Sequence, residues 1–131
     1  MVKIKDEYKI SEAADFLGIS ADTIRYYDNQ KILCPRKDEA TNYRYYTWSD
    51  LLSLEEILRL KRINFPLQQI GSIINEYTME QVLHAFQNHE QDLEKQLEEL
   101  TKARKMLRHY IQTYENFLHR EGQIGVEMSR F

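Results

Sequence analysis

The sequence is poor in the residues that mark disulfide frameworks, irregular loops and membrane spans. Its 131 residues include one cysteine, two prolines and four glycines. The single Cys34 excludes an internal disulfide and a multi-cysteine metal cage, and the scarcity of glycine and proline favours helix. The opening segment MVKIKDEYKI has no apolar core of signal-peptide length, and no run is long enough to cross a bilayer. We therefore expect a cytoplasmic protein without a membrane partner.

A strong charge of one sign is also absent. The formal net charge is −3, from 18 basic and 21 acidic residues, which does not by itself indicate a nucleic-acid partner. Between positions 25 and 44, however, five basic residues outnumber three acidic ones. The chain is long enough for one small domain and an appendage, but not for two full domains. Composition leaves DNA binding open.

Two short helices are predicted near the N-terminus. Ser11 is expected to cap the first, whose apolar residues follow helical spacing as far as Leu17, and Gly18 is expected to end it. Ser20 offers a second cap directly afterwards. Two short helices joined by a tight glycine-containing turn are typical of a helix-turn-helix, although a helical hairpin without a DNA-binding role has the same pattern.

The second helix has two distinct faces. Its spacing places Ile24 and Tyr27 inward, and Arg25 and Tyr26 outward. An arginine beside a tyrosine suits a helix in the major groove, because the guanidinium pairs with guanine or phosphate and the phenol reaches a backbone oxygen. Considered separately, Arg25 and Tyr26 could each equally be a solvated surface residue without a DNA-binding role.

Residues 36–46, RKDEATNYRYY, predict a small β-hairpin with a polar turn and an aromatic return strand. Alternation places Tyr43 and Tyr45 on one face and Arg44 and Tyr46 on the other. A hairpin with a protruding Arg44 would act as a wing that touches DNA, whereas the alternative is a simple connecting hairpin.

Thr47 and Asp50 form a capping box for a third helix, whose broad apolar arc as far as residue 63 indicates contact on more than one side. Asn64 can close this helix, and Pro66 can open a shorter fourth helix at its first turn.

A very long last helix is predicted from position 78, where Thr78 and Gln81 fit a capping box. No glycine or proline interrupts it before Gly122. Apolar residues recur in an unbroken 4-3 alternation, which is typical of a coiled-coil seam. The twelve seam positions, ten of them apolar, are Met79, Leu83, Phe86, Glu90, Leu93, Leu97, Leu100, Arg104, Leu107, Ile111, Tyr114 and Leu118. A helix of roughly 60 Å is too long to bury its seam on a small head, so we expect a homodimer.

The charged seam residues favour one orientation of that dimer. Glu90 and Arg104 occupy the same heptad position, so in a parallel pair each would face its own like-charged copy, which is costly. In an antiparallel pair centred near residues 97–100, Glu90 and the partner's Arg104 lie in neighbouring layers. The sequence therefore predicts an antiparallel coiled coil.

The segments YKISEAADFLGISADTIRYYDNQKIL and NYRYYTWSDLLSLEEILRLKRINFPLQQI resemble the MerR family of bacterial transcription regulators, over roughly residues 8–119. The pieces T-I-R-Y-Y, Y-R-x-Y and F-P-L-x-x-I are specific in this order and spacing. The resemblance implies a mainly α fold. It comprises a winged helix-turn-helix head in residues 1–77 with a small β-hairpin wing, and a long helix in residues 78–121 that forms an antiparallel coiled-coil dimer.

The resemblance also implies which residues contact DNA. They lie in the recognition helix, the wing and the end of the third helix: Thr23, Arg25, Tyr26, Tyr43, Arg44, Tyr45 and Lys61, with Thr23 and Tyr45 the weaker candidates. Two departures from the family pattern are Asn42 and Asn64, where glycine is usual. Asparagine tolerates positive φ, so both departures are compatible with the fold.

The implied mechanism is activation of palindromic promoters whose two elements are spaced too far apart. On binding an inducer, the dimer distorts the spacer so that RNA polymerase engages both elements, at a cost of a few kcal/mol of DNA deformation. No cysteine follows Cys34, and no two of the histidines His84, His89, His109 and His119 are four residues apart. We therefore expect no cofactor and a small-molecule, non-metal inducer.

The tail, residues 122–131, alternates Ile124, Val126 and Met128, which predicts one strand. It has two interpretations, the start of a separate effector domain or a frayed terminus. Two other classes of protein remain open: an architectural or excisionase-like DNA-binding protein, and a coiled-coil adaptor. An enzyme is disfavoured because the sequence offers no nucleophile–base pair, carboxylate cluster or phosphate-binding glycine loop.

Overall fold

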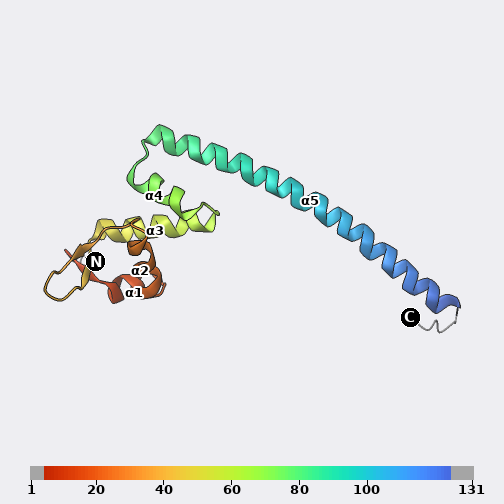
Figure 1. Ribbon diagram of the computed structural model, residues 1–131, viewed down its shortest axis with the longest axis horizontal. Coiled ribbons are helices and arrows are strands. Elements are labelled where there is room, and N and C mark those ends of the chain that lie inside the picture. Colours follow the sequence, from red (N-terminus) through yellow and green to blue (C-terminus); the bar gives the residue numbers. More distant parts are fainter. Residues whose placement is uncertain (1–4, 125–131) are drawn as a thin grey trace. The chain divides into compact units, whose positions relative to one another are not determined.

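The computed structural model describes residues 5–124 and divides into one compact unit that ends at Ala85 and a second that begins at Phe86. The fold is mainly helical with a small sheet and a long last helix, as the sequence predicts. The elements, labelled in Figure 1, are β1 (Tyr8–Lys9), α1 (Ile10–Leu17), α2 (Ala21–Asn29), β2 (Arg36–Lys37), β3 (Arg44–Tyr46), α3 (Trp48–Arg62), α4 (Leu67–Asn75) and α5 (Met79–Ile124).

Helix α1 begins two residues earlier than expected, because its N-terminal cap is Lys9. Ser11 lies inside the helix rather than at its cap, so that prediction is wrong. The carboxylate of Glu12 instead accepts a hydrogen bond of 3.1 Å from the backbone N–H of Lys9. The physical reason is that Lys9 belongs to β1, where pairing with Tyr45 holds the backbone extended up to the first helical residue.

The turn between α1 and α2 forms as predicted. Gly18 ends α1 in the left-handed conformation with φ 69°, which glycine adopts without steric cost. Ser20 caps α2, and its side-chain oxygen accepts a hydrogen bond of 3.1 Å from the N–H of Thr23. This turn sets α1 and α2 against each other as a helix-turn-helix, below α3 in Figure 1.

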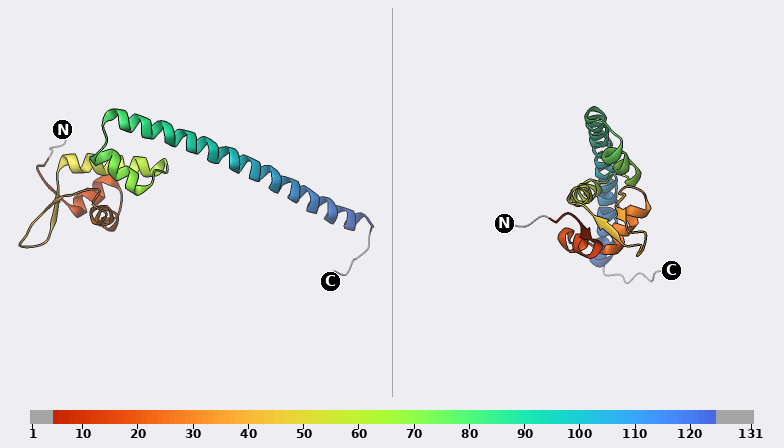
Figure 2. Two further views of the ribbon diagram at one scale, coloured as in Figure 1. Left: turned by 45° about the horizontal axis from the view of Figure 1, so that its top comes forward. Right: turned by 90° about the vertical axis from the view of Figure 1, so that its left-hand side faces the viewer.

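The sheet is antiparallel, with strand order β1-β3-β2. The predicted hairpin is β2 and β3, and the return strand begins at Arg44 rather than at Tyr43. Asn42 takes the left-handed conformation in the turn, with φ 63°. In the left view of Figure 2 the loop that contains it extends away from the helices of the first unit. Strand β1 was not predicted, since two residues carry no periodicity.

The core of the first unit lies where the three-stranded sheet meets the helices. Tyr46 and Leu51, which flank the start of α3, are both fully buried, as expected of residues with hydrophobic-staple spacing. The start of α3 is capped reciprocally by Thr47 and Asp50, through hydrogen bonds of 3.1 Å and 2.8 Å. The buried cluster comprises Ala13, Ala14, Ile24, Tyr27, Ile32, Leu33, Tyr46, Leu51, Leu54, Ile57, Leu60, Phe65 and Ile70.

The connection from α3 to α4 reverses the chain at Asn64, which has φ 68° as expected of a residue in place of glycine. Phe65 then enters the core, and Pro66 is the N-terminal cap of α4 rather than a member of its first turn. The Asn75 amide at the other end of α4 donates a hydrogen bond of 2.8 Å to the carbonyl of Ile32. This bond fixes α4 to the segment that follows α2.

Helix α5 is 46 residues long, which corresponds to about 69 Å. The capping box of Thr78 and Gln81 forms as predicted. The helix continues through Gly122 to Ile124, although we expected it to stop before Gly122. A helix-interior glycine costs only about 1 kcal/mol, so the remaining backbone hydrogen bonds carry the helix past it. Ile124 is therefore helical rather than extended, while Val126 and Met128 lie outside the described residues.

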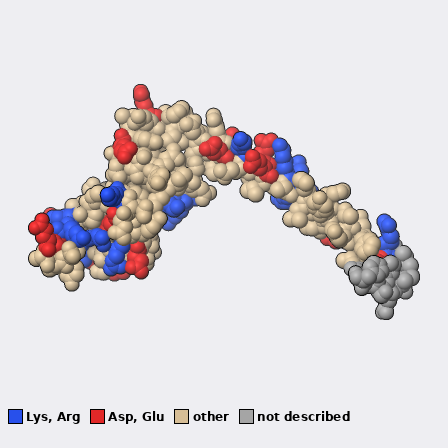
Figure 3. All heavy atoms as spheres, viewed as in Figure 1, with Lys and Arg blue, Asp and Glu red and all other residues tan. Residues whose placement is uncertain are grey.

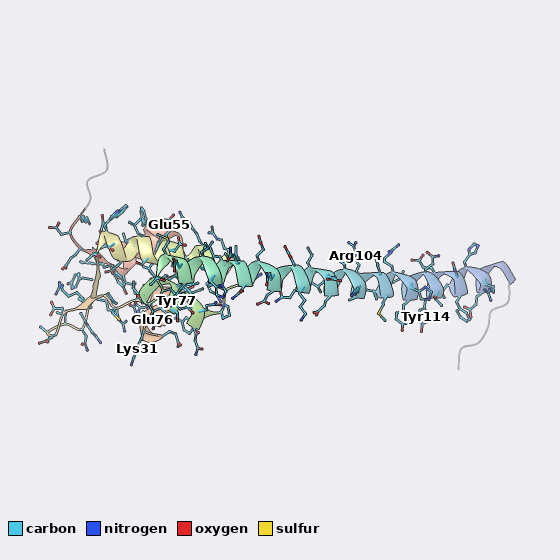
Figure 4. All side chains as sticks on the ribbon, turned by 90° about the horizontal axis from the view of Figure 1, so that it is seen from above. Lys31, Glu55, Glu76, Tyr77, Arg104 and Tyr114 are labelled. Carbon is cyan, nitrogen blue, oxygen red and sulfur yellow. The ribbon has the colours of Figure 1, made fainter. Side chains whose placement is uncertain are left out.

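The seam of α5 is open to solvent in the single chain. Leu97 and Leu100 expose 66% and 68% of their surface, and Figure 4 labels Arg104 and Tyr114 on the same helix. Figure 3 shows charged side chains gathered over the middle of α5, with mostly uncharged residues toward its C-terminal part on this face. Among the described residues, no helix is long and apolar enough to cross a membrane.

Candidate DNA-binding surface

The outward face of α2 presents the two residues expected to read DNA. Arg25 and Tyr26 are exposed, whereas Ile24 and Tyr27 are buried in the core. The guanidinium of Arg25 contacts Asp22 on the same helix, with an N–O distance of 2.7 Å. Such an exposed ion pair contributes little and is readily exchanged for a phosphate or a base edge. The predicted division of the helix into two faces is confirmed.

Thr23, the weaker candidate on this helix, is half-buried and engaged locally. Its hydroxyl lies 2.9 Å from the Ser20 hydroxyl, and its N–H donates to the same Ser20 oxygen. The structure therefore places Thr23 in the cap of α2.

The two wing tyrosines differ in their surroundings. Tyr43 exposes 66% of its surface at the end of the wing loop. Tyr45 is half-buried beneath the Arg36 guanidinium, which lies 4.8 Å from the ring centroid. Arg36 also forms a two-bonded ion pair with Glu7, at 2.8 Å and 2.7 Å. Tyr43 is therefore the accessible tyrosine, and Tyr45 is a packing residue between strands.

Arg44 does not protrude from the hairpin, contrary to expectation. Its side chain is 26% exposed, and its Nε lies 3.5 Å from Oδ2 of Asp28. A terminal nitrogen of the same guanidinium lies 3.4 Å from Oδ1 of Asn29. Arg44 shares a strand face with the buried Tyr46, so its side chain returns toward the C-terminal end of α2 instead of extending into solvent.

Asp28 is the residue that receives Arg44, and sequence reasoning did not identify it. Its side chain is 4% exposed, and its Oδ2 accepts a hydrogen bond of 2.5 Å from the hydroxyl of Tyr46. Among the described residues, Oδ1 of Asp28 has no hydrogen-bond partner. Helical spacing in the sequence could have identified Asp28 as an inward-facing residue, because it follows the buried Ile24 by four residues and so lies on the same face of α2.

The electrostatics of this cluster reflect its burial. Burial raises the pKa of Asp28 above its ordinary value, while the Tyr46 hydrogen bond and the Arg44 charge act in the opposite direction. Burial and the neighbouring Asp28 carboxylate raise the pKa of Tyr46, which therefore stays protonated as a donor. The wing and the recognition helix are thus joined by one charged contact and one hydrogen bond to the same carboxylate.

The last turn of α3 supplies a third set of basic residues. Arg59 is engaged by Glu55 and Glu56 on its own helix. Lys61 and Arg62 are exposed, and within residues 5–124 neither forms an ion pair. Lys61 is therefore a solvent-accessible cation, suited to a phosphate oxygen.

A cavity of about 470 Å³ lies between the end of α2 and α4, and is lined by Tyr26, Lys31, Gly71 and Glu76 among others. Figure 4 labels two of its lining residues, Lys31 and Glu76. Lys31 has φ 61°, a left-handed conformation that turns the chain after α2 toward α4. The described residues contain no group of three or more histidine, cysteine, aspartate or glutamate side chains arranged to hold a metal ion.

Comparison of the sequence with known families points to the same kind of protein as this geometry. Residues 8–77 match the model of the MerR HTH family regulatory protein, and residues 51–110 match the model of MerR, DNA binding. The chain is 30% identical over 108 residues to the uncharacterized HTH-type transcriptional regulator PA4778 of Pseudomonas aeruginosa, with 79% of this chain and 82% of that protein covered. It is 30% identical over 112 residues to the transcriptional activator mta of Bacillus subtilis, covering 86% of this chain.

A solved structure of this family has a similar fold. HiNmlR, a MerR family regulator lacking the sensor domain and crystallised bound to promoter DNA, is 29% identical, with a TM-score of 0.55 and 91% of each chain covered. The chain spans only 40% of the length of mta and about a third of another curated relative. Both family models are consistent with the observed helix-turn-helix, wing and long α5. The chain belongs to the MerR family of DNA-binding transcription regulators.

Proposed function

We propose that this protein is a homodimeric transcription regulator of the bacterial cytoplasm. It binds a palindromic promoter with a long spacer and activates RNA polymerase by distorting that DNA in response to a small-molecule, non-metal inducer. The observation that carries the proposal is the pairing, in one chain, of an exposed DNA-reading face on α2 with a 46-residue helix whose apolar seam is open.

The DNA contacts proposed for each head come from three elements. Arg25 and Tyr26 on α2 are exposed and reach base edges or phosphates, Tyr43 and Arg44 act from the wing, and Lys61 contacts a phosphate. The placements described above favour Tyr43 over Tyr45 and leave Thr23 as a capping residue. Each head then reads one half-site.

The dimer is supported by the exposure of the seam. Large apolar side chains at alternating spacings of three and four residues are open to solvent along α5, as Leu83, Leu97, Leu107 and Leu118 illustrate. A soluble helix does not retain such a stripe unless another surface covers it. A second copy supplies a stripe of the same length, and the charges of Glu90 and Arg104 favour antiparallel pairing. A palindrome follows, because a twofold dimer presents two identical heads.

The proposal is tested by selecting bound duplexes from random DNA with the purified chain and measuring its mass in solution. We expect a dimer and an enriched palindrome whose half-sites flank a central spacer. Transcription from a promoter carrying that palindrome should depend on the chain, and spacer length should determine activation. A chain that stays monomeric at high concentration and binds no duplex would refute the proposal. A dimer that binds no duplex would indicate the coiled-coil adaptor instead.

A further inference from the structure

The cluster of Asp28, Arg44 and Tyr46 joins two elements that contact DNA separately in the proposed function. Asp28 belongs to the recognition helix α2, and Arg44 and Tyr46 belong to strand β3 of the wing. The contacts are the 2.5 Å hydrogen bond from the Tyr46 hydroxyl and the 3.5 Å approach of the Arg44 Nε, both to Oδ2 of Asp28. Tyr46 is fully buried, so the carboxylate oxygen that meets the wing arginine is also anchored by a buried hydroxyl.

Arg44 cannot leave this site without cost. The Asp28 side chain is only 4% exposed, and Oδ1 already lacks a hydrogen-bond partner among residues 5–124. If Arg44 moved entirely to a DNA phosphate, a buried carboxylate would lose its neighbouring cation, which is strongly unfavourable. The guanidinium must therefore contact DNA while it remains beside Asp28.

The guanidinium has enough donors for both tasks. It carries five N–H groups in a rigid planar fork. One faces Asp28 and one approaches Asn29, so three stay available, and the side chain is partly open to solvent at 26% exposure. We propose that Asp28 is a positioning residue that holds the Arg44 guanidinium at the end of the recognition helix, so that its remaining donors meet a DNA phosphate from a fixed place. This inference rests on the proposed function.

The inference predicts the opposite sign from simple electrostatics. Asp28→Asn removes a negative charge near a polyanion, which by long-range attraction alone would strengthen DNA binding. Release of Arg44 should instead weaken binding, since the side chain must then be ordered on the DNA. Ordering one long side chain corresponds to a loss of roughly three- to ten-fold in affinity. Asp15→Asn on α1 is the matched control, because Asp15 is exposed and the substitution changes the same charge.

The experiment measures affinity for a fluorescently labelled duplex of the sequence that the wild-type chain selects, with the folding of each variant followed by circular dichroism. We expect Asp28→Asn to bind roughly three- to ten-fold more weakly than wild type, and Asp15→Asn to bind equally or slightly more tightly. In an Arg44→Ala background, Asp28→Asn should have no further effect on DNA affinity, because the guanidinium that Asp28 positions is already absent. A purely structural role would instead give the same loss in both backgrounds.

Arg44→Lys keeps the charge but replaces the rigid planar fork with a single nitrogen on a flexible stem, so Asp28 would hold its donors toward a phosphate less firmly, and its affinity should fall toward that of Arg44→Ala. This variant tests the inference even if Asp28→Asn does not fold. DNA affinity equal to that of the wild type in Arg44→Lys would overturn the inference. An affinity of Asp28→Asn equal to that of Asp15→Asn would also overturn the inference. So would a loss of affinity on adding Asp28→Asn to the Arg44→Ala variant. Absence of duplex binding by the wild-type chain would refute the proposed function itself.

Discussion

Truncating one seam leucine should separate the two copies of this protein in a measurable way. Leu100 exposes 68% of its surface in the single chain, so dimerisation would remove about two thirds of a leucine side chain from water. Full burial of leucine is worth about 1.5–3 kcal/mol, so each Leu100 contributes about 1–2 kcal/mol to association. Because a dimer holds two copies, Leu100→Ala should weaken it by about 2–4 kcal/mol.

That loss corresponds to a dissociation constant raised by roughly 30- to 700-fold. Sedimentation equilibrium over a range of concentrations measures it directly. Alanine favours helix at least as well as leucine, so α5 should keep its circular dichroism signal. Lys105→Ala is the matched control, because Lys105 is exposed on the same helix away from the seam. A dissociation constant that does not change in Leu100→Ala, or that changes equally in Lys105→Ala, would refute the assignment of the seam.

Three further predictions concern orientation, the wing cluster and a phosphate contact. A mixture of Leu97→Cys and Leu100→Cys chains should form mixed disulfides readily, whereas exclusive cross-linking between identical positions would establish a parallel pair. Because burial raises the pKa of Asp28 above 3.8, the folded state binds more protons than the unfolded state just above that pH. The contribution of Asp28 to the free energy of unfolding should therefore fall as pH rises through this window, and urea titrations should find that the wild type loses stability relative to Asp28→Asn across it. Lys61→Ala should weaken binding to all duplexes alike and lower the slope of log affinity against log salt by about one; a loss confined to one sequence would contradict a phosphate contact.

The features predicted correctly are those set by neighbours in the sequence. Gly18, Asn42 and Asn64 all take positive φ, because the local turns they occupy leave few alternatives. The capping boxes at Thr47 and Thr78 depend only on residues three positions away. Each of these is a property of four or five consecutive residues, so a single sequence is enough to find it.

The features that were missed depend on distant pairing. Strand β1 exists only because Tyr8 and Lys9 lie beside β3, and that pairing displaces the expected cap at Ser11. The direction of Arg44 is set by Asp28, sixteen residues earlier in the chain, which is buried only once the wing has packed against α2. Alternation along the hairpin gave the correct face for Arg44 but could not show that this face meets a carboxylate.

The seam of α5 has a consequence for how its length can vary. It repeats every seven residues, whereas a straight α-helix completes a turn in 3.6, so the stripe drifts by about 20° per heptad. Between Met79 and Leu118 the accumulated drift is on the order of 100°. Two such helices therefore keep their seams in contact only if they form a left-handed supercoil. Insertion of one residue would rotate everything beyond it by about 100° and bring the stripe out of contact. Insertions or deletions in this helix should therefore be tolerated in multiples of seven and in few other lengths.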